Sequence, residues 1–251
     1  MGRLTKINGY YYHSLICQNC CNSFFNRLKH QKFCCFKCYA EYHQKYSYNR
    51  NYFSKINTPQ KSYWIGFILG DGHLTRNGIQ LVFRLAKKDK IILKNFLDEI
   101  GGSYEQVKEY EHYNNMISLC ISSKQIVQDL INIGIPHKNK SFTAKPIKLP
   151  FQSAFWLGVF DADGSIGVYE ITDDRYSNPY KYNALNISLV GTKEICEGFS
   201  EFLDCNGKYV YKRGKIYNFS KGCKRLREVI YEKLYEYDIP SMERKKNVFK
   251  I

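Results

Sequence analysis

The sequence predicts an α+β fold of two similar repeats, each with the element order αββαββα, behind a small cysteine-rich N-terminal module. Two observations carry this prediction. The stretch Trp64–Gly72 recurs as Trp156–Gly164, with small residues at matching places. After each copy, strand-like alternation and helix-like spacing of apolar residues follow in the same order, so a duplicated unit is the simplest explanation.

Composition limits the classes of partner. The chain has 251 residues and a formal net charge of +15, with 22 tyrosines. A chain of this length holds one sizeable core with a small appendage, or two small domains. So strong a positive charge points to a polyanion, and duplex DNA, RNA or an anionic membrane surface all qualify on charge alone. The sequence has no apolar run long enough to span a membrane and no apolar signal region after its first residues, which predicts a soluble, intracellular protein.

The N-terminal module is predicted over residues 1–45. Six of the ten cysteines lie between Cys17 and Cys38, and such clustering favours metal binding over disulfides. Two thiolate pairs at this separation fit a tetrahedral Zn²⁺ site that folds a segment too short to have its own core. The spacing alone leaves open whether Cys34 or Cys35 binds together with Cys38.

The segment Phe33–Cys38 is similar to small zinc fingers that end in Phe-Cys-Ser-x-x-Cys, with Cys35 at the serine position. On that resemblance the zinc ligands are Cys17, Cys20, Cys34 and Cys38. Cys21, Cys35 and His30 stay open as replacements. Basic and tyrosine side chains around the cysteines fit contact with nucleic acid, and a purely structural module is the alternative. These side chains are Arg27, Lys29, His30, Lys32, Tyr39, Tyr42, His43 and Lys45.

Residues 46–57 show no apolar periodicity, so they are predicted to be a linker, with packing on the core as the alternative. The first repeated stretch follows Thr58-Pro59 and the second follows Pro150, and both prolines are helix-opening signals. Each stretch ends at a glycine suited to a left-handed helix cap. Two short helices are therefore predicted.

Small residues line one face of each predicted helix, Gly66 with Gly70 in the first and Gly158 with Ala162 in the second. Glycine inside a helix costs about 1 kcal/mol relative to alanine, so the glycines make most sense where two backbones approach closely. We therefore expect the two helices to pack against each other.

This packing brings Asp71 and Asp163 together at the C-terminal ends of the two helices. A carboxylate there meets the negative end of the helix dipole, and a second carboxylate adds like-charge repulsion. A divalent cation resolves both problems, and paired carboxylates with open coordination positions suit Mg²⁺. Two Asp-Gly turns that merely end core helices are the alternative.

The first repeat continues with strand and helix patterns. The predicted elements are strand His73–Lys87, helix Lys88–Ile100, hairpin Tyr104–Ile121 and helix Ser123–Gly134. Ile79, Leu81, Phe83 and Leu85 alternate with polar residues, which predicts one buried strand face. The outward side chains are of types that read DNA grooves, with a solvated sheet face as the alternative. They are His73, Arg76, Asn77, Gln80 and Arg84.

The second repeat has the same order with an extra segment, which makes the halves unequal. The predicted elements are strand Ser165–Ile171, insertion Thr172–Tyr182, strand Asn183–Val190, helix Lys193–Leu203, hairpin Lys208–Phe219 and helix Cys223–Tyr237. The outward polar residues expected to contact DNA here are Lys181, Asn183, Asn186, Ser188, Arg213 and Lys215. A twisted sheet from two such halves would form a concave basic saddle, and β-ribbons can enter the major groove.

Both repeated stretches resemble the LAGLIDADG motif, and the chain resembles a single-chain, two-repeat LAGLIDADG homing endonuclease over about residues 58–251. The second copy is the closer match, because the first has Leu69 where an acid often stands. The resemblance implies repeats at 58–145 and 146–251, and a monomer that cuts both strands of a long, asymmetric duplex site to leave short 3′ overhangs. A non-cleaving RNA maturase or DNA-binding regulator of the same fold is the alternative.

The resemblance also implies roles for individual residues. Asp71 and Asp163, next to Gly70 and Ala162, would hold catalytic Mg²⁺. A lysine near the end of each repeat would serve the developing charge or the water network, and the matching residues are Lys140 and Lys245. The polar residue that the family places at the end of the second strand is matched by Lys87, whereas the second half has Gly191 there. Unequal cutting of the two strands follows as an expectation.

Overall fold

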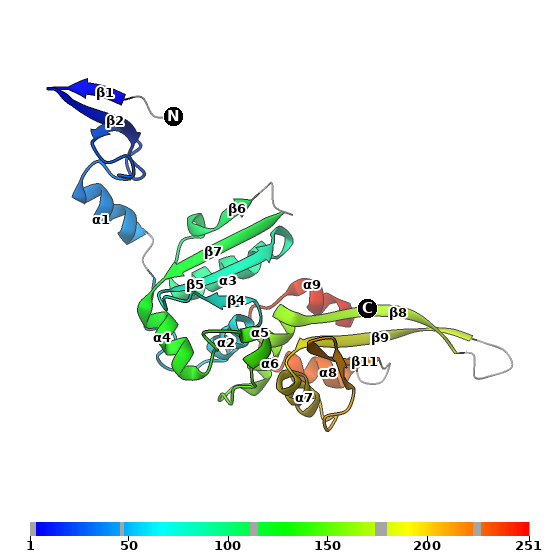
Figure 1. The fold of residues 1–251 in the computed structure, drawn as a ribbon. Coiled ribbons are helices and arrows are strands. Elements are labelled where there is room, and N and C mark those ends of the chain that lie inside the picture. The colour runs from blue at the N-terminus through cyan, green and yellow to red at the C-terminus, as the bar shows by residue number, and fades with distance from the viewer. Residues whose placement is uncertain (1–3, 46–47, 111–114, 174–179, 223–226, 251) are drawn as a thin grey trace. The chain divides into compact units, whose positions relative to one another are not determined.

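The computed structural model describes residues 4–45, 48–110, 115–173, 180–222 and 227–250 (Figure 1). The chain divides into two compact units, one of residues 1–49 with 101–106 and one of residues 50–100 with 107–251. Both contain helices and strands, so the predicted α+β class is confirmed. Among the described residues, no helix has the length and apolar character that crossing a membrane requires.

The first unit is a three-stranded antiparallel sheet followed by a helix. Its elements are β1 (Leu4–Ile7), β2 (Tyr10–Ile16), β3 (Ser23–Asn26) and α1 (Phe36–Lys45). The strands pair in the order β1-β2-β3. Of its side chains that the structure describes, only Cys17, Phe33 and Cys38 are buried in a core, with Phe24 and Tyr42 packed against them. An apolar core this small calls for a further source of stability.

Two helices cross at the centre of the second unit, α2 (Pro59–Asp71) and α6 (Gln152–Asp163). A Cβ added to Gly66 would lie 2.0 Å from the Phe155 carbonyl oxygen, and a Cβ on Gly158 would lie 2.0 Å from the Tyr63 carbonyl oxygen. Side chains larger than hydrogen cannot fit where the backbones approach so closely. The predicted glycine-mediated helix pair is confirmed.

The two helices begin differently. Thr58 caps α2, since its hydroxyl accepts a bond of 3.3 Å from the Lys61 N–H, and Pro59 occupies the first helical position as predicted. Helix α6 begins at Gln152, two residues beyond Pro150, so that proline does not open it.

The predicted left-handed caps at the two glycines that follow the helices are wrong. Gly72 has φ −76° and Gly164 has φ −86°, both extended, and each starts a strand. Glycine is required there for space instead. A Cβ would meet Ile68 at 2.7 Å in the first case and Phe160 at 2.2 Å in the second.

Each half of the second unit contains one four-stranded antiparallel sheet, and the two sheets have the same topology. The strands are β4 (Gly72–Leu74), β5 (Gln80–Ala86), β6 (Lys108–Tyr110) and β7 (Met116–Ser122), then β8 (Gly164–Asp173), β9 (Tyr180–Gly191), β10 (Val210–Arg213) and β11 (Ile216–Gly222). The first sheet runs β4-β5-β7-β6 and the second β8-β9-β11-β10. The predicted duplication is confirmed.

The helices complete the two repeats. They are α3 (Lys90–Ile100), α4 (Lys124–Ile133) and α5 (Lys140–Thr143), then α7 (Lys193–Phe202), α8 (Arg227–Leu234) and α9 (Glu243–Lys246), with short 3-10 turns at Lys87–Asp89, Tyr104–Gln106 and Asn247–Lys250. Apolar residues of α3, α4 and α7 are fully buried, as the amphipathic patterns predict.

The single strand predicted after the first repeated stretch is two strands in the structure. The segment His73–Lys87 folds as a β4–β5 hairpin, whose turn is closed by a 3.0 Å bond from the Thr75 N–H to the Gln80 carbonyl. Leu81, Phe83 and Leu85 are buried as predicted, whereas Ile79, in the turn, is 41% exposed.

The predicted insertion Thr172–Tyr182 lengthens a hairpin. Strands β8 and β9 stay in register out to the pair Asp173 and Tyr180, and the ribbon extends away from the rest of the sheet (Figure 1). Residues 174–179 lie outside the described residues.

Part of the predicted linker packs on the second unit. Tyr52 and Phe53 are buried, and the Tyr52 hydroxyl donates to Glu99 at 3.2 Å. Residues 50–57 therefore follow the alternative of packing on the core, while residues 46 and 47 lie outside the described residues. The domain boundaries as a whole stay a prediction.

Candidate active site and metal centres

Asp71 and Asp163 end α2 and α6, where the two helices cross. A Cβ on Gly70 would meet Asp163 Oδ2 at 2.9 Å and Ala162 Cβ at 2.3 Å, so the second helix end lies directly against the first. Burial raises the pKa of Asp71 to about 7, and the charge of Asp163 adds to the rise. The structure thus brings together two acids that are far apart in the sequence.

Burial also raises the pKa of Asp163, opposed by the positive charges of Lys140 and Lys245. The same burial lowers the pKa of each lysine to about 8, opposed by nearby acids. Four ionisable groups therefore share one poorly solvated site.

Each of the two lysines closes the C-terminal end of one central helix. The Lys140 ammonium donates to the carbonyls of Ile68, at 3.2 Å, Gly70 and Gly72. An ammonium has three protons, so all three are used. The carbonyls in the last turn of a helix have no partner within it, and a cation there also meets the negative end of the dipole.

Lys245 does the same for α6. Its ammonium donates to Phe160 and Asp161 carbonyls at 2.7 Å and to the Gly164 carbonyl at 2.6 Å. Main-chain bonds therefore hold both lysines, Lys140 and Lys245, inside the site. Their protons point at the helix ends that carry Asp71 and Asp163.

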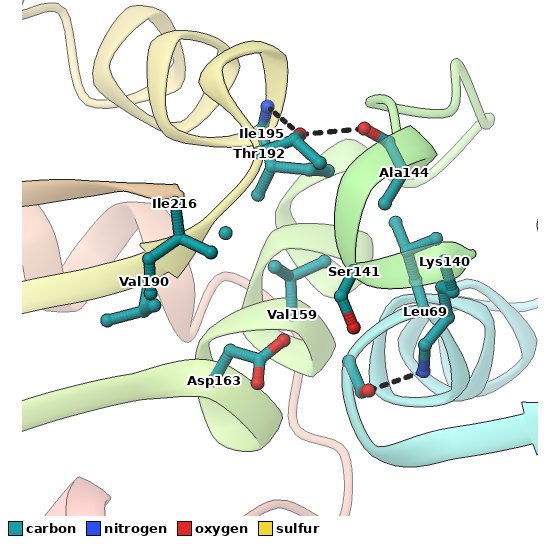
Figure 2. A pocket seen from close by; sticks show the side chains of 12 residues that line it. Leu69, Lys140, Ser141, Ala144, Val159, Asp163, Val190, Thr192, Ile195 and Ile216 are labelled. Atoms are coloured by element: carbon teal, nitrogen blue, oxygen red, sulfur yellow. Dashed lines mark hydrogen bonds between the residues drawn. The ribbon is translucent and has the colours of Figure 1, made fainter. Parts of the chain in front are cut away.

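A cavity of about 250 Å³ opens beside Asp163, between the end of α2, α5, α6, β9 and α7. Figure 2 shows the Asp163 carboxylate and the Ser141 hydroxyl directed toward it. Gly191, at the end of β9, also lines the wall. The predicted match of Gly191 with Lys87 is wrong, because strand register pairs Gly72 with Phe83 and Gly164 with Leu189, which aligns Gly191 with Leu85 and Lys87 with Lys193. Lys87 itself forms an ion pair of 2.7 Å with Glu109 on β6.

Asp161 is a buried residue whose role the sequence did not predict. Its Oδ2 accepts from the Tyr63 hydroxyl at 2.9 Å and from the Met242 N–H at 2.7 Å. Burial raises its pKa to about 6 despite these bonds, which favour the charged form. It fastens the segment that carries Lys245 onto α6. The sequence offered one signal for this role, because Asp161 stands where the first copy of the repeated stretch has Leu69.

An ion pair that the sequence did not predict joins the two halves of the second unit. Arg244 donates two bonds to Asp89, of 2.7 Å and 3.1 Å, and Asp89 is almost fully buried. Bidentate pairs of this kind fix orientation as well as distance. Because α9 carries both Arg244 and Lys245, the contact also positions the second lysine.

The residues predicted to contact DNA fall in three groups. His73 lies on β4, and Arg76 and Asn77 in the exposed turn after it, where the Asn77 side chain accepts from the Thr75 hydroxyl. Side chains opposite the buried residues of β5 and β9 form the polar sheet faces; they are Gln80, Arg84, Asn186 and Ser188. Arg213 and Lys215 are exposed at the β10–β11 turn.

Lys181 and Asn183 differ from this pattern. They alternate with Asn186 and Ser188 along β9, so they point to the opposite face of the extended ribbon. Lys181 forms an ion pair of 2.8 Å with Glu170.

In the first unit, the sulfurs of Cys17, Cys20, Cys34 and Cys38 all lie within 4.8 Å of one another. The Cys34 sulfur is 3.7 Å from that of Cys20 and 3.5 Å from that of Cys38. Zinc–sulfur bonds of about 2.3 Å in a tetrahedron set sulfurs about 3.8 Å apart. The four-cysteine cluster therefore fits a zinc ion, with the predicted ligands.

The open alternatives lie around this cluster. The Cys35 sulfur is 3.9 Å from that of Cys34 and accepts from the Cys38 N–H at 3.5 Å. Cys21 and His30 are exposed and outside the cluster. The side chains of His43 and Lys45 lie outside the described residues.

No protein-family model matches the sequence, and no curated protein matches it either. Solved structures do match. The LAGLIDADG homing endonuclease I-LtrWI, bound to target DNA, has a TM-score of 0.56 at 12% identity, over 80% of this chain and 89% of that chain. Meganuclease I-SmaMI, bound to uncleaveable DNA, has 0.56 at 12%, over 78% and 87%. The LAGLIDADG homing endonuclease I-GzeII, in complex with its DNA target, has 0.51 at 16%, over 78% and 88%.

The chain has the LAGLIDADG fold. The predicted family resemblance is thereby confirmed at the level of architecture. Sequence identities this low show the LAGLIDADG fold alone, so activity must be argued from the residues of this chain. I-SmaMI has also been solved with cleaved DNA, and with uncleaved DNA in the presence of calcium ions.

Proposed function

We propose that the second unit is a site-specific endonuclease that hydrolyses both strands of a long, asymmetric DNA duplex and leaves short 3′ overhangs. The meeting of Asp71 and Asp163 at the crossing of α2 and α6 carries the proposal, because each half contributes one acid. The DNA-bound proteins of the same fold support it. Both halves belong to one chain, so a monomer suffices.

The donor set fits a divalent metal. Two carboxylates with raised pKa values lie together, next to Gly70 and Ala162, at the negative ends of two helices. Without a cation this arrangement costs free energy, and hard oxygen ligands with open positions suit Mg²⁺. When bound, Mg²⁺ would supply an activated water and neutralise charge on the phosphate.

The remaining residues orient the site. Lys140 and Lys245 hold the two helix ends and place positive charge beside the acids, which favours a bound phosphodiester. With a pKa near 8, each stays mostly protonated at neutral pH. Lys87 would assist at the first half, as the family resemblance implies for the polar residue at the end of the second strand.

DNA contact is assigned to the polar sheet faces and turns of the second unit, which hold the side chains that the sequence predicts for this role other than Lys181 and Asn183. A net charge of +15 supports the assignment, since neutralised phosphates release counterions. In the first unit, Zn²⁺ bound by Cys17, Cys20, Cys34 and Cys38 would stabilise a module with almost no apolar core.

Cleavage of a selected target tests the proposal. The zinc-loaded protein is incubated with a library of randomised duplexes and Mg²⁺, and cut molecules are recovered by ligation to 3′ overhangs. The recovered sequence then serves as substrate with Mg²⁺, and without it as control. A protein that retards this duplex but leaves it whole would be a DNA-binding regulator, and retention of folded intron RNA alone would indicate a maturase.

A further inference from the structure

The three-stranded sheet of the first unit has two unlike faces. Strand register places Leu15 opposite Phe24 on one face, and Phe24 packs against the buried cysteines and Phe33. Residues one position along each strand point the other way. We call these the outer sheet face. Its apolar and aromatic side chains, with Arg27 beside them, are Ile7, Tyr10, Tyr12, Ile16, Phe25 and Arg27, and its small polar ones are Thr5, Ser14 and Ser23.

The outer sheet face is apolar and exposed. Ile16 is 70% exposed, Tyr10 57% and Phe25 52%. Exposed apolar groups gathered on one surface mark interaction sites more often than isolated ones do. Its strand residues and Arg27 include no carboxylate, and residues 1–49 hold seven lysines and arginines against a single acid, Glu41.

Arg27 lies across the aromatic part of this face. Its guanidinium carbon is 4.0 Å from the centre of the Tyr10 ring and 5.5 Å from that of Tyr12, and Nη2 donates to the Tyr12 hydroxyl at 3.5 Å. A planar cation held over rings is itself a stacking surface for bases. A membrane surface would instead be met by a cation extended toward the lipid phosphates.

The spacing of the rings selects the form of nucleic acid. Tyr10 and Tyr12 are two residues apart on β2, which separates them by about 6.8 Å along the strand. Stacked bases in a duplex rise by only about 3.4 Å per step. Bases that rest on both rings must therefore be unstacked, as in a single strand.

We propose that the outer sheet face binds single-stranded nucleic acid, by stacking bases on Tyr10, Tyr12 and Arg27 while the basic module attracts the backbone. This site is separate from the duplex contacts of the second unit. Aromatic platforms on basic surfaces bind single strands with little sequence preference. RNA and DNA share this chemistry, so the test includes both.

The test titrates the zinc-loaded, full-length protein into fluorescein-labelled dT or U oligonucleotides of about 15 nucleotides, without Mg²⁺, and reads anisotropy. Tyr10→Ala should raise the Kd about tenfold. Tyr11→Ala is the matched control, because Tyr11 is equally exposed but lies on the other face, and it should change the Kd less than about twofold. Arg27→Gln should weaken binding more than Lys29→Gln, although each removes one charge.

A second variant guards against misfolding. In Tyr10→Trp the new indole should be quenched by either oligonucleotide, whereas in Tyr11→Trp it should not; Trp64 and Trp156 are buried and give a constant background. Preference for dT or for U identifies the biological strand.

Several results would overturn the proposal. They are absence of binding to both single strands, equal losses in Tyr10→Ala and Tyr11→Ala, a stronger response to a duplex of the same length, and Tyr10-dependent binding to anionic vesicles or to a second copy of the chain. None of these depends on whether the second unit cuts DNA.

Discussion

The two halves of the second unit agree in what lies at their shared axis and differ in what lies away from it. Both have a glycine against the partner backbone, an acid at the helix end and a lysine on the last carbonyls. They differ at Leu69 against Asp161 and, by strand register, at Leu85 against Gly191. A two-fold contact between backbones constrains both copies at once, whereas a side chain such as Asp161 has partners, Tyr63 and Met242, that Leu69 cannot bond.

The two halves also fasten their lysines by different means. In the first half, His137 bonds the Thr75 carbonyl at 2.7 Å, three residues before Lys140. In the second, Asp161 accepts from the Met242 N–H, three residues before Lys245. The segment before the lysine is thus fixed in the first half by His137, which bonds the residue after β4, and in the second half by Asp161, a buried acid on the central helix α6.

The largest expected effect tests the equivalence of the two acids. Asp71→Asn and Asp163→Asn should each reduce cleavage of both strands by at least about a thousandfold while duplex binding is kept, because one metal site needs both carboxylates. Strand-resolved cleavage of an end-labelled duplex measures this. Asp98→Asn, an exposed acid on α3, is the control. Full cutting of one strand in either variant would show that the acids act separately.

The glycine contacts should be equally symmetric. Gly66→Ala and Gly158→Ala each place a methyl group about 2 Å from a carbonyl oxygen of the other helix, so each should lower the free energy of unfolding by about 3 kcal/mol or more. Urea denaturation measures the loss. Gly78→Ala is the control, since a Cβ there has open space and costs only the strain of φ +69°, about 1 kcal/mol. A large difference in stability between Gly66→Ala and Gly158→Ala would mean that one helix shifts to accommodate the added methyl group.

These symmetric features were the predictable part of the site. Glycine spacing, the repeated Asp-Gly ends and the two lysines are local patterns, and the second copy confirms the first. The Cys17–Cys38 cluster is local in the same sense.

The unpredicted contacts depend on the assembled fold. Arg244 meets Asp89 and His137 meets Thr75 only once distant segments are packed. The need for glycine at Gly72 and Gly164 comes from crowding by Ile68 and Phe160, which the sequence pattern does not reveal.

The free energy of unfolding should depend on pH through Asp71. Its pKa is raised from 3.8 to about 7 in the folded state, so the folded protein holds a proton that the unfolded chain has released between these values. The free energy of unfolding of metal-free protein should therefore fall as pH rises from about 4 to 7.

Asp71→Asn cannot ionise and should exceed the native protein by on the order of 2 kcal/mol above pH 7, with no gain below about pH 4. Urea denaturation at a series of pH values measures the difference in free energy of unfolding between the variant and the native protein. Loss of zinc at low pH affects both proteins equally and cancels in this difference. Added Mg²⁺ at pH 8 should stabilise the native protein only. A constant difference at every pH would contradict the raised pKa.

The anchor at Asp161 distinguishes the halves in stability. Asp161→Asn keeps an oxygen that accepts from Tyr63 and Met242, whereas Asp161→Leu copies the first half and leaves both donors unpaired. The leucine variant should be about 2 kcal/mol less stable than the asparagine variant, since a buried donor without a partner costs about 1–3 kcal/mol. Amide exchange at Met242 should be faster in it. Equal stability of the leucine and asparagine variants would show that the packing of α9, without the Asp161 bonds, holds the segment that carries Lys245.

The smallest expected effect concerns Lys87, which follows β5 in the first half and corresponds by strand register to Lys193 in the second. If Lys87 assists one cut, the native protein nicks one strand before the other, and Lys87→Met should lower the faster rate by about tenfold without changing the slower one. Lys88→Met, next to it and exposed, controls for loss of charge. The ion pair with Glu109 gives an internal check, because Glu109→Gln removes this pair and should leave the strand order intact. Equal strand rates in the native protein, or an equal loss on both strands in Lys87→Met, would contradict a role for Lys87 at one cut.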